Sequence, residues 1–235
     1  MGAPEHSPQN YFGAGRSSTY DRKIRASLPG YEALHAMVDD LLRQALPAQA
    51  RLLIVGAGTG MELVTLGEAH PGWSFTATDL SAEMLAIGRA NVEAAGLADR
   101  VRFHLGPVQD LPPDEAYDAA TSILISHFIR AREERGRFFG AIAARLRPGA
   151  PLVTAELVGD RQDAGCAHLL EAWKGHYAAA GIPPREVEED FARTDATVSF
   201  IPEAALLALL AGSGFADVRR FFQAFLFGGW VACRA

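Results

Sequence analysis

The chain has 235 residues, of which 49% are hydrophobic and 21% charged, a composition typical of a folded globular domain. Its formal net charge of −6 disfavours nucleic acid as a partner, because an acidic surface repels a phosphate backbone. Cys166 and Cys233 form no CxxC pair, so neither a disulfide framework nor a metal site is indicated. The chain contains no apolar run long enough to cross a membrane. We therefore expect a cytoplasmic protein that folds as a single domain over residues 1–235.

Hydrophobic patterning predicts strands alternating with helices in chain order. Strands are expected over residues 51–56, 74–79, 101–105, 118–125 and 152–157, with helices over 31–46, 61–69, 81–95 and 132–146. A helix over 202–211 and a closing pair of strands, 218–227 and 229–234, complete the pattern. This order indicates an α/β fold with a doubly wound, Rossmann-like sheet of seven strands. Ligands bind such sheets at the carboxyl ends of the strands.

Two segments stand outside this alternation. Residues from about 1 to 46 form a predicted N-terminal cap, and residues from about 159 to 200 interrupt the β-α order. We expect the second segment to be a lid over the substrate. Ser81-Ala-Glu-Met84 has the pattern of a capping box, in which a hydroxyl and a carboxylate satisfy free amides, and Gly96 is expected to cap the same helix at its other end.

A glycine-rich loop, Val55-Gly-Ala-Gly-Thr-Gly60, joins the first strand to the following helix. Glycines let the backbone approach a ligand closely, and the helix N-terminus presents free amides. Asp79 ends the next strand, where a carboxylate can accept hydrogen bonds from both hydroxyls of a ribose. Met61 occupies the position of the third glycine in the G-x-G-x-x-G pattern of NAD sites. The combination favours S-adenosylmethionine over a dinucleotide.

Three landmarks resemble the class I S-adenosylmethionine-dependent methyltransferases: Leu53–Gly60, Asp79-Leu80 and the turn Leu146-Arg-Pro-Gly149. More narrowly, the chain is similar to the carboxy-S-adenosylmethionine synthase family in Tyr20-Asp21-Arg22, Leu28-Pro-Gly-Tyr31 and the tail Phe221-Phe-Gln-Ala-Phe-Leu-Phe-Gly228. The resemblance implies a class I sheet whose last strand is antiparallel, and S-adenosylmethionine or its carboxylated form as cofactor. It also implies a homodimer, for which the aromatic tail is either an apolar contact or simply two core strands.

The resemblance implies roles for individual residues. Tyr31 contacts the amino-acid end of the cofactor, Leu80 flanks the adenine, and Val108 offers its amide to the adenine in place of a side chain. An ungapped reading places Arg193 where the family pairs an arginine with the extra carboxylate of its product. The alternative for Arg193 is a solvated arginine among acidic neighbours. The expected cofactor contacts are Tyr20, Tyr31, Gly56, Ala57, Gly58, Gly60, Asp79, Leu80, Met84, Val108, Ile123 and Arg193.

Methyl transfer from a sulfonium requires an acceptor held in line with the methyl group. If the acceptor must lose a proton, a base near the strand ends is needed. The candidates are His127, Glu156 and His176, and the alternative for each is a packing or loop-anchoring role. We thus expect a methyltransferase acting on a small molecule. The alternatives are a carboxy-S-adenosylmethionine synthase that uses prephenate as carboxyl donor, an NAD-dependent oxidoreductase and a cofactor-binding module without catalysis.

Overall fold

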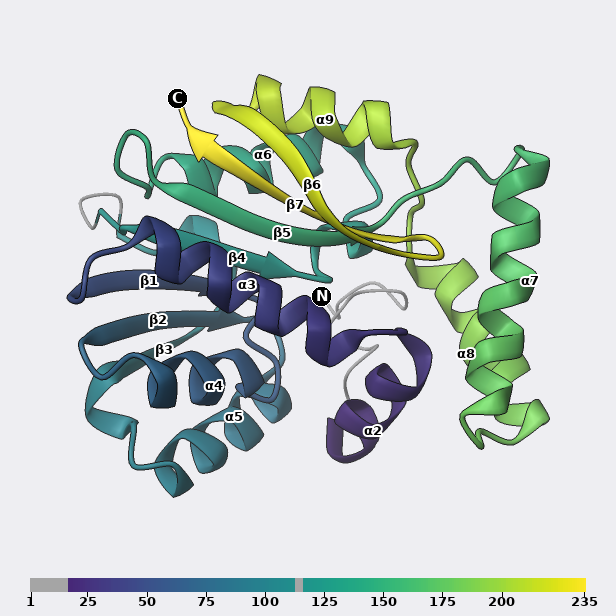
Figure 1. Cartoon of the computed structure of the whole chain (residues 1–235), viewed down its shortest axis with the longest axis horizontal. Coiled ribbons are helices and arrows are strands. Elements are labelled where there is room, and N and C mark those ends of the chain that lie inside the picture. The colour runs from purple at the N-terminus through teal and green to yellow at the C-terminus, as the bar shows by residue number, and fades with distance from the viewer. Residues whose placement is uncertain (1–16, 113–115) are drawn as a thin grey trace, which may run out of the picture.

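The computed structural model describes residues 17–112 and 116–235. Within them, seven strands form one sheet in the order β3-β2-β1-β4-β5-β7-β6 (Figure 1). The strands are β1 (Ala50–Val55), β2 (Trp73–Asp79), β3 (Val101–Leu105), β4 (Ala119–Ile123), β5 (Pro151–Leu157), β6 (Phe215–Ala224) and β7 (Phe227–Arg234). The first five are parallel, and β7 runs antiparallel to both neighbours. The predicted α/β doubly wound sheet with an antiparallel last strand is therefore confirmed.

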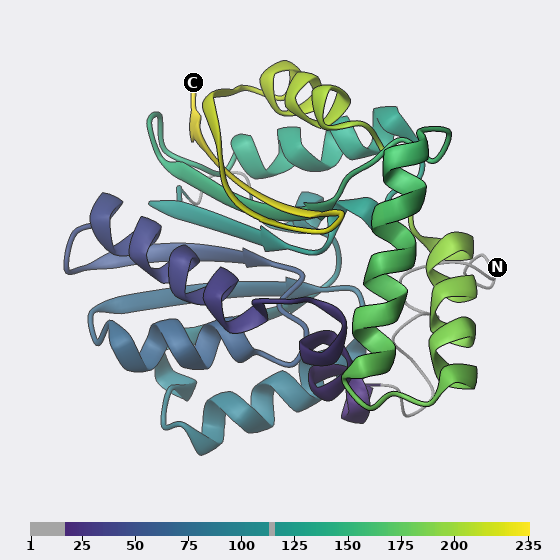
Figure 2. The same cartoon turned by 45° about the vertical axis from the view of Figure 1, so that its right-hand side comes forward.

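Helices cover both faces of the sheet, as Figures 1 and 2 show. They are α3 (Tyr31–Ala45), α4 (Met61–Ala69), α5 (Ala82–Ala94), α6 (Arg132–Ala143) and α9 (Glu203–Gly212). Side chains of β1 alternate between two hydrophobic cores. Leu52 and Ile54 pack in the core that includes α3 and α4, whereas Leu53 and Val55 pack in the core that includes α6 and α9. A strand buried on both faces explains the continuous apolar run over residues 52–55.

The sheet reverses its order between β1 and β4, since chain-distant strands pair there. Leu124, directly after β4, has a φ of 63° and ends the strand two residues earlier than predicted. A non-glycine residue in the left-handed region is strained and is often found beside a functional site. The reversal point is also where ligands bind in doubly wound sheets.

The closing hairpin turns at Phe225 and Leu226, whereas the sequence placed the turn near Gly228. Gly228 and Gly229 lie inside β7 because neighbouring rings need their space. A Cβ on Gly228 would come within 2.2 Å of the Trp230 ring, and one on Gly229 within 2.8 Å of the Phe221 ring. The glycines therefore serve close packing rather than a turn.

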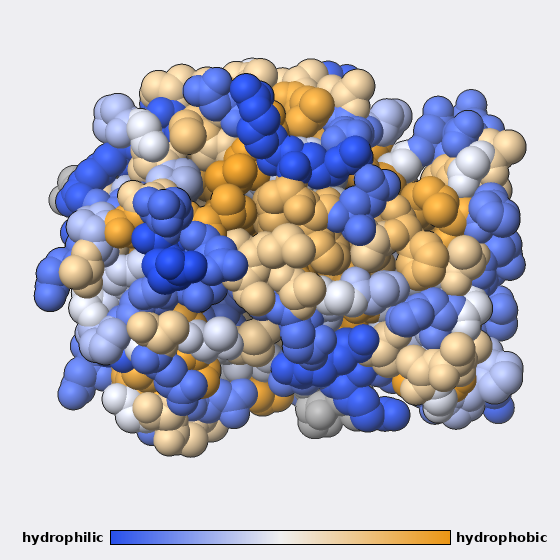
Figure 3. All heavy atoms as spheres, viewed as in Figure 1, coloured by the Kyte–Doolittle hydropathy of each residue, from blue (hydrophilic) through white to orange (hydrophobic). Residues whose placement is uncertain are grey.

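The aromatic tail is largely core. Phe222, Phe227 and Trp230 are buried within this chain. On the face shown in Figure 3, apolar side chains gather at the centre, between α3 and the β6–β7 hairpin, and Met37 on α3 is 39% exposed. The homodimer stays a prediction.

Three further helices lie at the carboxyl ends of the parallel strands: α2 (Ser17–Ser27), α7 (Ala164–Ala179) and α8 (Pro184–Thr197) (Figure 2). They belong to the segments predicted as cap and lid, although residues 1–16 of the cap lie outside the described residues. Lys23 on α2 contacts Asp190 on α8 at 2.7 Å, and the Trp173 Nε1–H on α7 donates to the Ser27 carbonyl at 2.8 Å. Helix α2 is thus tied to α7 and α8.

None of the helices among the described residues combines the length and the apolar character that crossing a bilayer requires.

Candidate functional site

The glycine loop is folded back onto β2. The backbone N–H groups of Gly56 and Ala57 both donate to the Thr78 carbonyl, at 2.8 and 2.9 Å. Gly56, Gly58 and Gly60 have φ values of 78°, 53° and 77°. Residues with a Cβ rarely adopt such positive φ angles. The loop therefore presents backbone, rather than side chains, at the end of β1.

Asp79 links this loop to the next one with a single carboxylate. The Gly58 N–H donates to Oδ2 at 2.9 Å, and the Ser81 N–H donates to Oδ1 at 2.8 Å. Burial raises the pKa of Asp79, and the backbone hydrogen bonds partly offset that rise. The Ser81 hydroxyl accepts from the Met84 N–H at 3.2 Å, as the predicted capping box requires. The carboxylate of that box, however, is supplied by Asp79 from outside the helix.

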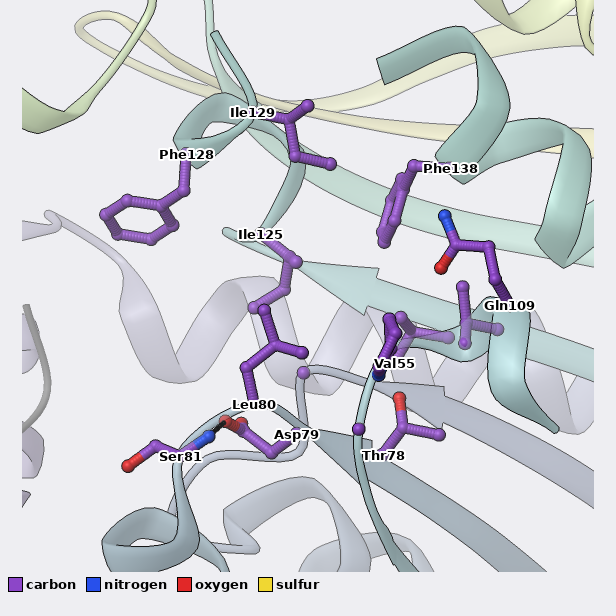
Figure 4. A pocket seen from close by; sticks show the side chains of 14 residues that line it. Val55, Thr78, Asp79, Leu80, Ser81, Gln109, Ile125, Phe128, Ile129 and Phe138 are labelled. Carbon is purple, nitrogen blue, oxygen red and sulfur yellow. Dashed lines mark hydrogen bonds between the residues drawn. The ribbon is translucent and has the colours of Figure 1, made fainter. Parts of the chain in front are cut away.

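A first cavity lies between the ends of β2 and β3, and we call it the β2–β3 cavity. Figure 4 shows Phe138, Ile129 and Ile125 on one side of it and Leu80 with Asp79 on another. Its lining is Val55, Gly56, Thr78, Asp79, Leu80, Ser81, Gly106, Pro107, Val108, Gln109, Ile125, Phe128, Ile129 and Phe138. Most of these residues are apolar, so the cavity suits a flat, weakly polar ring.

A second cavity, the α3–α4 cavity, lies on the other side of the glycine loop. It is lined by Tyr20, Tyr31, His35, Gly56, Ala57, Gly58, Thr59, Met61, Glu62, Asp79, Met84, Ile123, Leu124 and Ile125. Burial raises the pKa of Glu62 to about 7 and lowers that of His35 to about 4. It also raises the pKa of Tyr31. Because His35, Glu62 and Tyr31 line it, this cavity is more polar than the β2–β3 cavity.

The two cavities meet at Asp79, Gly56 and Ile125, which line both. Ile125 lies directly on the loop, since a Cβ on Gly56 would come within 2.1 Å of its Cδ1 atom. A ligand with a flat ring at one end and a polar group at the other can pass through both cavities. The Asp79 carboxylate then lies beside the middle of such a ligand, where the two cavities join.

A third cavity, the lid cavity, lies between the sheet and helices α2, α7 and α8. Tyr20, Ile24, Ser27, Leu124, His127, Phe128, Leu157, Trp173, Thr194, Val198 and Phe227 line it. Tyr20 and Leu124 also line the α3–α4 cavity. The lid cavity therefore adjoins the polar end of the proposed ligand path.

His127 is held in this lining by Glu156. The imidazole Nδ1 lies 3.2 Å from Glu156 Oε2 and 3.4 Å from the Leu157 amide nitrogen. The Ser126 and His127 N–H groups and the Thr154 hydroxyl also donate to the Glu156 carboxylate. In one tautomer Nδ1 accepts from the Leu157 N–H, and in the other Nδ1–H donates to Glu156, which leaves a lone pair on Nε2. Histidine paired in this way can act as a base.

Most of the predicted cofactor residues come together around the two joined cavities. These are Tyr20, Tyr31, Gly56, Ala57, Gly58, Asp79, Leu80, Met84, Val108 and Ile123. Gly60 does not line either cavity. It caps α4 and packs on α5, where its Cβ would lie 3.1 Å from the Gly88 backbone.

Three other predicted residues lie apart from the cavities described. Glu156 is 1% exposed and anchors His127 from behind. His176 lies on the flank of α7 beside Phe225, because Trp173 and Tyr177 take the inward face of that helix. Arg193 lies on α8 outside the three cavity linings, with its Nε buried and lacking a hydrogen-bond partner in the described structure.

The sequence did not indicate Glu62, His35, Ile125 or Phe138. Glu62 follows the glycine loop by two residues, which could have marked it as a neighbour of the ligand. His35 and Phe138 come from helices far away in the chain, and only the packing of those helices places them here. Local patterns carry no signal for such contacts.

Comparisons with known proteins identify what the chain is similar to. Residues 52–149 match a family model described as a methyltransferase domain. Among curated proteins, the chain is 22% identical to a carboxy-S-adenosyl-L-methionine synthase of Campylobacter curvus over 88% of this chain and 86% of that protein. It is 36% identical to a demethylmenaquinone methyltransferase of Thermus thermophilus, over 46% of this chain and 48% of that protein. The chain spans only 24% to 48% of three of the curated relatives it matches.

Solved structures show the same fold. An O-methyltransferase family protein of Burkholderia thailandensis matches with a TM-score of 0.69 and 16% identity, over 98% of this chain and 64% of that one.

Proposed function

The chain belongs to the class I S-adenosylmethionine-dependent methyltransferases, and on that premise we propose that it methylates a small-molecule acceptor held in the lid cavity. The family and the enzyme class confirm what the glycine loop and Asp79 predicted from the sequence. The acceptor, the site roles and the cytoplasmic location are our proposals. The observation that carries the proposal is the continuous path from the β2–β3 cavity past Asp79 to the lid cavity.

The residues present fit the cofactor. Phe138, Ile129 and Leu80 form an apolar slot suited to adenine, and Val108 lines the same cavity. The Asp79 carboxylate lies where the two cavities join, so it suits the two ribose hydroxyls. Gly58 leaves room beside the carboxylate, since a Cβ there would meet only Met84 Cε, at 3.4 Å. The remainder of the cofactor would extend into the α3–α4 cavity.

S-adenosylmethionine supplies an electrophilic methyl group on a positively charged sulfur. The protein contributes orientation, because the lid cavity meets the α3–α4 cavity at Tyr20 and Leu124. His127, in the tautomer with a lone pair on Nε2, would accept on that atom the proton that a hydroxyl or ammonium acceptor loses on methylation. Glu156 holds the ring and stabilises its positive charge. We propose no catalytic role for His176.

Calorimetric titration with S-adenosylmethionine tests the cofactor assignment. We expect binding by the intact chain and its loss in the Asp79→Ala variant, with the circular dichroism of both proteins alike. Absence of binding to the intact chain at millimolar cofactor would overturn the proposed function. Formation of a methylated product from a panel of hydroxylated small molecules then identifies the acceptor class.

A second candidate function is synthesis of carboxy-S-adenosylmethionine from prephenate. Its support is the length of the similarity, since three such synthases match over 88% to 90% of this chain. Arg193 is the candidate partner of the extra carboxylate, although Ile123 stands where that family has an asparagine. The mass of the cofactor that copurifies with the protein distinguishes the two functions.

A further inference from the structure

Two buried polar atoms belonging to residues that line the α3–α4 cavity lack hydrogen-bond partners in the described structure. They are Oε1 of Glu62, in the first turn of α4, and Nε2 of His35, on α3. The Glu62 residue as a whole keeps some exposure, but this oxygen is buried. His35 is 8% exposed, and its ring packs edge-on against Tyr31 at 4.6 Å. Buried groups of this kind normally have partners, so a ligand is expected to supply them.

The two side chains offer complementary chemistry. Burial keeps His35 neutral, because it lowers its pKa to about 4, and a neutral imidazole can donate from Nε2. Burial raises the pKa of Glu62 to about 7 and outweighs the opposing effect of the nearby Thr121 hydroxyl on β4, so an approaching cation favours the ionised form. The Thr121 hydroxyl does not reach hydrogen-bond geometry with Glu62 Oε1.

The charged and titratable neighbours are few. Tyr31 on α3 interacts with Glu62 and with Asp21 on α2, while Arg25 on α2 and Glu32 on α3 influence both Tyr31 and His35. Asp21 accepts a hydrogen bond from the Thr59 hydroxyl at 2.8 Å, and Arg25 contacts Glu32 at 2.9 Å. Asp21 is therefore paired with the glycine loop, and Arg25 and Glu32 are paired with each other.

We propose that Glu62 and His35 form the receptor for a zwitterionic α-amino acid group, the end of the cofactor that lies beyond Asp79. Glu62 accepts hydrogen bonds from the α-ammonium, and His35 donates its Nε2–H to the α-carboxylate. The assignment rests on the proposed function, since it requires the nucleoside to lie along the path described.

Binding is then coupled to one proton. In the empty site near pH 6, Glu62 carries a proton and the free ligand carries an ammonium group. When the ammonium reaches the carboxyl group, the O–H bond of Glu62 breaks and its proton leaves to the buffer, while the ammonium keeps its three protons. The complex therefore contains a carboxylate and an ammonium.

Two nucleosides make a matched pair of probes. S-adenosylhomocysteine contains the α-amino acid group, whereas 5′-methylthioadenosine keeps the adenosine and the sulfur but lacks that group. Titration calorimetry at about pH 6 in phosphate and in a buffer of high ionisation enthalpy measures the protons released. We expect close to one proton for the first nucleoside and none for the second. Binding of S-adenosylhomocysteine without proton release overturns the assignment of Glu62.

Variants test the residues separately. Glu62→Gln should abolish the proton release and weaken S-adenosylhomocysteine about tenfold or more, with 5′-methylthioadenosine unchanged. Glu83→Gln, at the same position of α5, is the matched control and should behave as the original protein. His35→Phe should weaken S-adenosylhomocysteine alone, and His35→Gln, which keeps an N–H donor, should restore part of the affinity.

The outcomes separate this proposal from the proposed function. If the intact chain binds neither nucleoside, the proposed function fails and this receptor fails with it. If the intact chain binds both but Glu62→Gln weakens both equally, or neither, the receptor alone is overturned. Should Glu62→Gln fail to fold, the proton measurement on the intact chain still decides.

Discussion

Glu156 holds His127 twice with one carboxylate. Its Oε2 atom accepts from the His127 backbone N–H at 3.0 Å and lies 3.2 Å from Nδ1 of the same residue. Because both residues are buried, the orientation of the imidazole is set by the core rather than by solvent. The ring therefore lines the lid cavity in a prepared position.

This relationship predicts distinct kinetic effects. We expect His127→Gln to lower kcat by about 10² to 10⁴, because a general base contributes that much, with cofactor affinity unchanged. Glu156→Gln should lower kcat less, since the base remains but its charged form loses stabilisation. His176→Gln, beside Phe225, should leave kcat as it is. A rate unchanged by His127→Gln would show that the acceptor needs no base here.

The close approach of Gly60 to α5 predicts a loss of stability on substitution. Gly60→Ala places a side chain at a φ of 77° and a Cβ 3.1 Å from the Gly88 backbone. Gly96→Ala is the matched control, because its φ is 70° but nothing lies within 4 Å of its Cβ. We expect about 1 kcal/mol from backbone strain in both and roughly 1–2 kcal/mol more for Gly60→Ala. Urea unfolding measures the difference, and equal losses would contradict the packing argument.

Glu62 predicts how the stability of the empty protein depends on pH. The carboxyl ionises near its ordinary pKa of 4.5 when unfolded but only at about 7 when folded. The unfolded state thus releases its proton first, and stability falls as pH rises from 4.5 to 7. Glu62→Gln removes this effect.

The stability of Glu62→Gln relative to the original protein should increase by about 2 kcal/mol between about pH 5.5 and about pH 8. Urea unfolding at both pH values measures the change, and Glu83→Gln should show none. Parallel pH profiles for Glu62→Gln and the original protein would place this carboxyl in water.

The contact between α2 and α8 predicts an effect on the acceptor. Lys23 Nζ lies 2.7 Å from Asp190 and 3.3 Å from Glu186. Burial lowers the pKa of Lys23, but the two carboxylates outweigh it and raise the pKa overall. Lys23→Met should raise KM for the acceptor several-fold with little change in kcat, because the walls of the lid cavity separate more readily.

The loss in global stability should stay below about 1 kcal/mol, as for other partly exposed ion pairs. Arg185→Met, which breaks the exposed Arg185–Glu189 pair within α8, is the control. Hydrogen exchange should quicken in α2 and α8 for Lys23→Met only. Unaltered exchange in both helices would mean that this pair does not hold them together.

The sequence alone determined the class of fold and the cofactor loop. Leu52 to Val55 form a continuous apolar run, which is typical of a strand covered on both faces. The glycines within residues 56–60 mark a turn with positive φ angles. Asp79 follows its strand directly, so its place beside the loop follows from the order of the elements. Such features are local or depend only on the alternation of strands and helices.

Only the tertiary structure decided which side chains line the cavities. His35 and Glu62 lie 27 positions apart on different helices, and His127 meets Glu156 from the neighbouring strand. These contacts depend on how the helices pack and on the direction that the chain takes at Leu124, directly after β4. Neither feature produces a periodic pattern in the sequence. The turn was placed near Gly228 for the same reason, since the Trp230 ring decided the position of that glycine. Likewise, only the packing of α7 placed His176 beside Phe225.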